Sequence, residues 1–95
     1  MNAHPNEIVL DVSELEPCEP LERTLEACAH LPAGSYLRVL HRREPFPLYE
    51  LLSAQGLCYR TRQNSEAAFE IFIWGAEDTA AVAALEASTG IEVSH

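Results

Sequence analysis

The chain has 95 residues, enough for one domain with a single hydrophobic core. A hydrophobic fraction of 47% and a charged fraction of 22% are ordinary for a globular protein, and no apolar run approaches the roughly 20 residues of a membrane span. The net charge of −9 argues against charge-driven binding to nucleic acid. The first residues lack the basic and apolar segments of a signal peptide. We therefore expect a cytoplasmic protein with reduced cysteines and no membrane association.

Hydrophobic spacing predicts the element order βαβαββ. Prolines suit the first positions of both helices, and a glycine suits the end of the second helix. Leu48, Leu51 and Leu52 form the predicted inner face of that second helix, and the first strand is predicted to be mostly buried. The predicted strands are Glu7–Val12, Ser35–His41, Leu57–Gln63 and Ala67–Trp74, and the helices are Pro20–His30 and Pro47 to the cap at Gly56.

The C-terminal segment differs in character. Ala76–Ser88 is alanine-rich and acidic, with Val82 and Leu85 as its only large apolar residues, and it predicts a third helix that ends at Gly90. Because this helix offers little apolar area, we expect it to dock loosely or on a partner. The prediction is one α+β domain over residues 1–95, with its core in 7–74 and a helical extension in 75–95.

Basic residues gather in the middle of the chain. All six are arginines, and five of them lie between residues 32 and 62, whereas the flanking segments are acidic. Two explanations stay open. The arginines reflect a GC-rich genome, or their guanidinium groups serve an anionic ligand, whose oxygens they can bind through two parallel hydrogen bonds.

Two motifs carry a resemblance to known families. Leu10–Glu22 (LDVSELEPCEPLE) resembles the signature of the TusA-like (SirA-like) sulfur carriers, in which a strand leads through a short loop to Cys-Pro-x-Pro at the start of a helix. Here the pair is exchanged, so that Pro17 stands where the sulfur-carrying cysteine would be and Cys18 where the first proline would be. Together with Pro17–Pro20 (PCEP), the segment His41–Gly56 (HRREPFPLYELLSAQG) resembles a TusA-related family catalogued as a domain of unknown function, number 2249.

The resemblance covers residues 7–74 and implies a bacterial two-layer α/β sandwich, in which two helices lie on one face of a four-stranded mixed sheet. It implies no established activity. Since a βαβ crossover makes the first two strands parallel, the loops after them meet at one edge of the sheet, beside two helix N-termini. Ligands of open α/β sheets favour this edge. The residues that we predict to bind an anionic or thiol-linked group there are Cys18, Glu19, His41, Arg42 and Arg43.

Three functions stay open for this edge. The first is a small binding or carrier module that is not a stand-alone enzyme and needs no cofactor. The second is a sulfurtransferase-like carrier with a persulfide on Cys18, whose thiolate a helix N-terminus would favour. The third is a metal or redox sensor using His41, although no HxH, HxxxH or CxxC spacing supports a metal site. The alternative to all three functions is that Cys18 and His41 have only structural roles. Cys28 and Cys58 are predicted to be packing residues.

The sheet face opposite the two helices is predicted to be open and to expose apolar side chains among arginines. Such a face favours association with a partner protein or self-association, through the sheet itself or the C-terminal helix. Aromatic residues are too few among the arginines to indicate nucleic-acid binding. The residues predicted on this face are Val9, Tyr36, Arg38, Leu40, Arg60, Arg62, Phe72 and Trp74.

Overall fold

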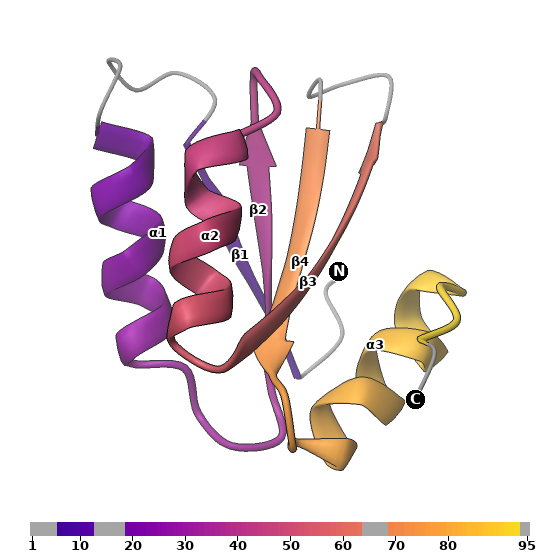
Figure 1. Ribbon diagram of the computed structural model, residues 1–95. Helices are drawn as coiled ribbons and strands as arrows, with labels where there is room; N and C mark the ends of the chain where they lie inside the picture. The colour runs from indigo at the N-terminus through magenta and orange to yellow at the C-terminus, as the bar shows by residue number, and fades with distance from the viewer. Residues whose placement is uncertain (1–5, 13–18, 64–68, 94–95) are drawn as a thin grey trace.

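A computed structural model describes residues 6–12, 19–63 and 69–93, which fold into a four-stranded mixed sheet and three helices (Figure 1). The predicted order of elements is confirmed. No helix in these ranges is long and apolar enough to cross a membrane. The elements are β1 (Glu7–Asp11), α1 (Glu19–Ala29), β2 (Tyr36–His41), α2 (Phe46–Ala54), β3 (Leu57–Gln63), β4 (Phe69–Gly75) and α3 (Thr79–Thr89).

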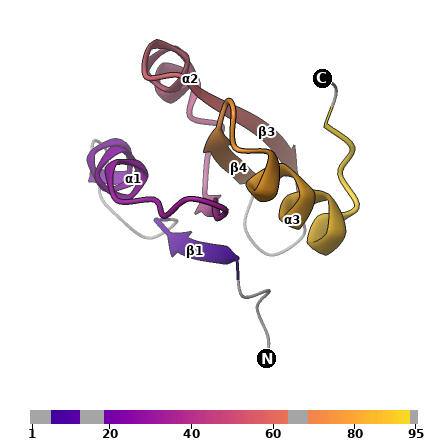
Figure 2. The same cartoon turned by 90° about the horizontal axis from the view of Figure 1, so that it is seen from below.

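The strands lie in the order β1-β2-β4-β3. β1 pairs parallel with β2, and β4 runs antiparallel between β2 and β3, so that β1, β2 and β3 all point the same way. α1 and α2 are the crossovers between these parallel strands, and both lie on one face of the sheet (Figure 2). This arrangement is the predicted sandwich of two helices on a four-stranded sheet.

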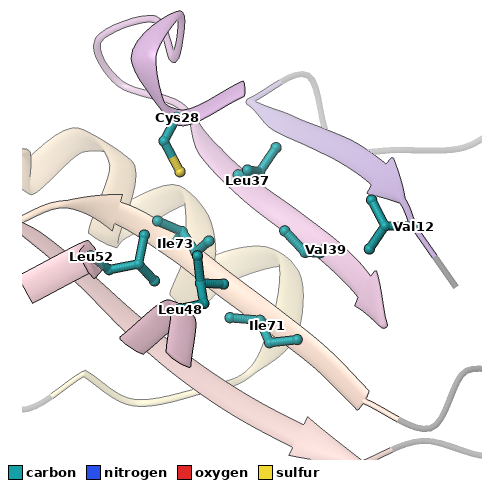
Figure 3. Close-up of a cluster of buried hydrophobic side chains, with 8 residues drawn as sticks. All are labelled: Val12, Cys28, Leu37, Val39, Leu48, Leu52, Ile71 and Ile73. Carbon is teal, nitrogen blue, oxygen red and sulfur yellow. The ribbon is translucent and has the colours of Figure 1, made fainter. Parts of the chain in front are cut away.

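The main core fills the space between the sheet and α1 and α2 (Figure 3). Alternate residues of β2 and β4 point to this side, as the period of two requires. Leu48 and Leu52 of α2 are buried as predicted, but Leu51 is 39% exposed. A helix turns about 100° per residue, which carries Leu51 to the flank while Leu48 and Leu52 stay on one stripe. The buried side chains are Val12, Cys28, Leu37, Val39, Leu48, Leu52, Ile71 and Ile73.

The first strand is not mostly buried, contrary to the prediction. β1 lies at the edge of the sheet and pairs only with β2 among the described strands. Its Val9 is 46% exposed, and Ile8 is also exposed. An apolar run of this kind indicates a buried central strand only when other strands or helices cover both faces, and here the strand order places it outermost.

The third helix packs on the sheet, and this corrects the prediction of loose docking. α3 lies on the face opposite α1 and α2 and contacts β2 and β4 (Figure 2). It buries Ala81, Val82 and Leu85, so that the predicted open face is closed over three of its aromatic residues. Tyr36, Phe72 and Trp74 are buried beneath it, whereas Val9 is exposed as predicted.

Polar contacts fix both ends of α3. The Asp78 carboxylate accepts hydrogen bonds from the N–H of Gly34 (2.7 Å) and from the N–H of Ala81 (3.1 Å), which caps the helix and ties it to the turn after α1. Gly90 ends the helix in a left-handed conformation with φ of 76°. These bonds compensate for the small apolar area of α3 that made its docking hard to predict.

Candidate functional site

The carboxyl ends of β1 and β2 lie side by side at one edge of the sheet. The strands pair in parallel register, and the N–H of Val12 donates to the Leu40 carbonyl at 3.0 Å just beyond β1. α1 and α2 both begin at this edge (Figure 1), where each helix contributes the positive end of its dipole. The parallel pairing predicted for the first two strands is confirmed.

The five residues predicted to form the site are not all described. Cys18 lies outside the described residues, and Glu19 is described only in its backbone, as the first residue of α1. His41 is the last residue of β2, and Arg42 and Arg43 follow it in the connection to α2. The structure therefore brings His41, Arg42 and Arg43 to the edge, while their proximity to Cys18 stays a prediction.

His41 holds the connection that carries the arginines. Its imidazole is half-buried, and its Nδ1 accepts the backbone N–H of Arg43 at 3.2 Å. Acceptance at Nδ1 requires that this nitrogen carries no proton, so the neutral ring has its proton on Nε2. Burial lowers the pKa of His41 from its ordinary value of 6.5, which favours this neutral form. His41 therefore positions the turn at neutral pH and adds no positive charge.

We expect acidification to destabilise the fold through His41. Because the pKa of His41 is lower in the folded than in the unfolded protein, its contribution to stability is fully present above about pH 6.5 and is lost as the pH falls through the folded-state pKa. NMR titration should give His41 a pKa below 6.5, and the Arg43 amide resonance should move in the same transition. His41→Asn keeps an acceptor oxygen but does not titrate, so it should remove this component; an unchanged pH dependence in H41N would contradict the assignment.

Arg42 and Arg43 are exposed and have no acidic partner in the described part of the chain. The backbone N–H of Arg43 is used by His41, but neither guanidinium forms a salt bridge or a hydrogen bond with a described residue. No residue in the described ranges therefore occupies their donors.

The other arginines of the central cluster are used within the fold. A charged row crosses the face that carries α3, with one side chain from each strand: Glu7, Arg38, Glu70 and Arg62. Arg38 lies 3.7 Å from Glu7 and also donates to Glu70, whose other oxygen accepts from Arg62 Nε at 2.6 Å. Arg62 also donates to the carbonyl of Thr89, the last residue of α3. Arg60 donates to the carbonyl of Glu92, just beyond that helix.

This division sorts the five central arginines by their use in the fold. Arg38, Arg60 and Arg62 share the face opposite α1 and α2, as predicted, and they stabilise that face and α3. Arg42 and Arg43 serve no such purpose among the described residues, so of the five central arginines these two have guanidinium groups without a described partner.

Phe46, which the sequence analysis did not single out, follows these arginines in the chain and belongs to a group of three aromatic residues. Phe46 opens α2 and contacts Tyr49 edge-on, with ring centroids 6.0 Å apart at 85°. Tyr49 in turn stacks on Tyr59 of β3 at 4.3 Å. The Tyr49 hydroxyl donates to Glu44 (3.1 Å) and lies 2.5 Å from the Thr61 hydroxyl. The signal was present as an aromatic residue between two prolines, but its exposure depends on where α2 lies over the sheet.

Two of the three cysteines are described, and both pack against hydrophobic clusters, Cys28 buried and Cys58 partly so. The Cys28 sulfur points into the main core (Figure 3), and burial raises its pKa to about 11. Cys58 is partly buried against the aromatic cluster under α3. The structural roles predicted for these two residues are confirmed, which leaves Cys18 as the thiol with a possible chemical role.

We expect Cys28 to resist alkylation in the folded protein. At about pH 8 a free thiol reacts readily with iodoacetamide because a fraction is thiolate, but a thiol with a pKa of about 11 is almost wholly protonated and is also enclosed by the core. Peptide mapping by mass spectrometry should find Cys28 unmodified in the native protein and modified in guanidinium chloride. Rapid labelling of native Cys28 would show that the helix carrying it opens readily.

In the described ranges no group of three or more His, Cys, Asp and Glu residues is placed to hold a metal ion. The comparisons with known proteins give a family and no activity. A family model described as "Uncharacterized conserved protein (DUF2249)" matches residues 9–75, and the chain belongs to this family. No curated protein and no solved structure matches the chain.

Proposed function

We propose that this member of the DUF2249 family is a small binding or carrier module, not a stand-alone enzyme, which holds an anionic group at the edge formed by the ends of β1 and β2. The observation that supports the proposal is the division of the arginines: Arg38, Arg60 and Arg62 are used within the fold, whereas Arg42 and Arg43 are exposed and have no described partner. A pair of planar guanidinium groups suits carboxylate, phosphate or sulfate oxygens.

The start of α2 adds a favourable field but few free donors. Its first turn contains no acidic residue, so nothing in that turn opposes an anion. The N–H groups of Phe46 and Leu48 are already bonded to the carbonyls of Glu44 and Pro45. The helix therefore contributes chiefly its dipole, and direct hydrogen bonding falls to Arg42 and Arg43. The net charge of −9 opposes anions at long range, but physiological salt screens exposed charges beyond about 8 Å.

The test is titration of the protein with inorganic phosphate, followed by NMR of the backbone amides. We expect the shifts to centre on Arg42 and Arg43, and we expect Arg42→Ala and Arg43→Ala each to weaken binding about tenfold, the loss of one charge-assisted hydrogen bond. Arg23→Ala removes an exposed arginine from α1 and is the matched control, with affinity unchanged. Wild-type affinity in both site variants, with unchanged melting temperatures, would refute the proposal.

A thiol-linked group is the second candidate, and Cys18 would carry it. The support is elimination: Cys28 is buried with a raised pKa, and Cys58 is partly buried against the cluster under α3, so persulfide chemistry has Cys18 as its remaining thiol. Incubation with a cysteine desulfurase and its sulfur donor should add one sulfur atom to the intact mass of the wild type but not of Cys18→Ser. Absence of the adduct, while a known carrier is loaded in parallel, would exclude this candidate.

A further inference from the structure

Phe46 is the most exposed large apolar side chain in the described part of the chain. The residue is 64% exposed, although full burial of a phenylalanine side chain stabilises a protein by about 1.5–3 kcal/mol. Hydrophobicity therefore favours a ligand that covers this ring.

Phe46 lies within reach of the proposed anion site. Phe46 is the third residue after Arg43, and the chain between them is tightened by a hydrogen bond from the Phe46 N–H to the Glu44 carbonyl at 3.0 Å. Even fully extended, three residues span only about 11 Å. The backbones of Arg43 and Phe46 are therefore close enough for one small molecule to contact both side chains.

The ring is held by its surroundings. Pro45 and Pro47 restrict the backbone on both sides of it. Tyr49 supports it edge-on, and Tyr49 is itself fixed by the stack on Tyr59 and by its contacts with Glu44 and Thr61. A surface that is already ordered loses little conformational entropy when a ligand stacks on it.

Phe46 is also isolated from the other exposed apolar side chains. Among the described residues, Ile8 and Val9 lie on β1, which is the outermost strand of the sheet. Leu51 lies on α2, about 140° around the helix from Phe46. A stable protein interface buries about 800 Å² on each partner around its anchor residues, and the described residues form no apolar patch of that kind around Phe46. A single ring beside two cations fits a small molecule better.

We infer that the edge takes an anion joined to a planar aromatic ring, with Arg42 and Arg43 on the acidic group and Phe46 stacked on the ring. This inference rests on the proposed function and names the class of ligand for that same site.

The experiment compares three phosphate esters that carry the same anionic group. Titrations with methyl, cyclohexyl and phenyl phosphate should give phenyl phosphate the tightest binding, by about tenfold over methyl phosphate, because aromatic stacking adds to the shared anion contact. Phe46→Ala should remove this preference and leave methyl phosphate binding unchanged, whereas Phe46→Trp should keep it. Leu51→Ala, which truncates another exposed apolar side chain of α2, should bind all three esters like the wild type.

The outcomes separate the two proposals. Equal affinity for methyl and phenyl phosphate would overturn the inference and leave the anion site standing. Equal affinity for cyclohexyl and phenyl phosphate would overturn the requirement for a planar ring. Absence of binding by any ester would overturn both the anion site and the inference built on it. Unchanged melting temperatures in the Phe46 variants would show that these differences arise from the ligand contact.

Discussion

Replacement of Glu70 by glutamine is expected to lower the free energy of unfolding by about 2–3 kcal/mol. Glu70 is 2% exposed and accepts hydrogen bonds from Arg38 and Arg62, one on each carboxylate oxygen. In the glutamine variant an NH₂ group faces one of these guanidinium groups, so a donor meets a donor and a cation loses its counterion. Loss of one partner of a buried pair costs about 3–5 kcal/mol. Because both arginine side chains are partly exposed and water screens them, we expect the loss of stability in E70Q to be at or below the lower end of that range.

Chemical denaturation of E70Q and the wild type measures this loss, with Glu50→Gln as the control because Glu50 is exposed on α2. A double-mutant cycle with Arg62→Met should give a coupling energy above about 1 kcal/mol, since the two side chains are in direct contact. If E70Q unfolds within about 0.5 kcal/mol of the wild type, the charged row is a surface network of the ordinary weak kind.

The charged row shows what the sequence could and could not predict about the arginines. The alternation of β3 placed Arg60 and Arg62 on one face, and the period of two was enough for that. Glu70, the partner of Arg62, lies on β4, and its burial follows from β4 being inserted between β2 and β3. A strand order of this kind comes from long-range pairing, which local patterns do not contain.

The same limit explains the errors in burial. β1 has the apolar, β-branched composition of a central strand, yet it lies outermost, so Ile8 and Val9 are exposed. Conversely, α3 has few large apolar residues, yet it covers Tyr36, Phe72 and Trp74 because Asp78 ties its start to Gly34. Composition predicted how apolar each element is, whereas its position in the sheet decided how much of that surface is buried.

For the candidate site, the sequence predicted the location better than the components. Parallel pairing of the first two strands was enough to place His41, Arg42 and Arg43 at the edge where α1 and α2 begin. The separation of free from paired arginines needed the positions of Glu7 and Glu70, and the exposure of Phe46 needed the position of α2. The contribution of Cys18 stays a prediction.

Replacement of Leu85 by alanine is expected to have the second large effect, because it tests whether α3 belongs to the folded core. Leu85 is fully buried against the aromatic cluster under α3, and truncation of a buried leucine costs about 2–5 kcal/mol. Trp74 is the single tryptophan and is buried in the same cluster, so its fluorescence reports directly on this packing. We expect L85A to lose about 3 kcal/mol of stability, with red-shifted emission and greater quenching by acrylamide.

Leu51→Ala is the matched control, since it removes the same atoms from a leucine that is partly exposed on α2 and far from Trp74 in the fold. It should cost no more than about 1 kcal/mol and leave the emission of Trp74 unchanged. If L85A instead has the same free energy of unfolding as the wild type while its tryptophan becomes accessible, α3 can undock without unfolding the domain. The sheet with α1 and α2 is then stable without it. The aromatic face that it leaves would then be the surface for association that the sequence predicted.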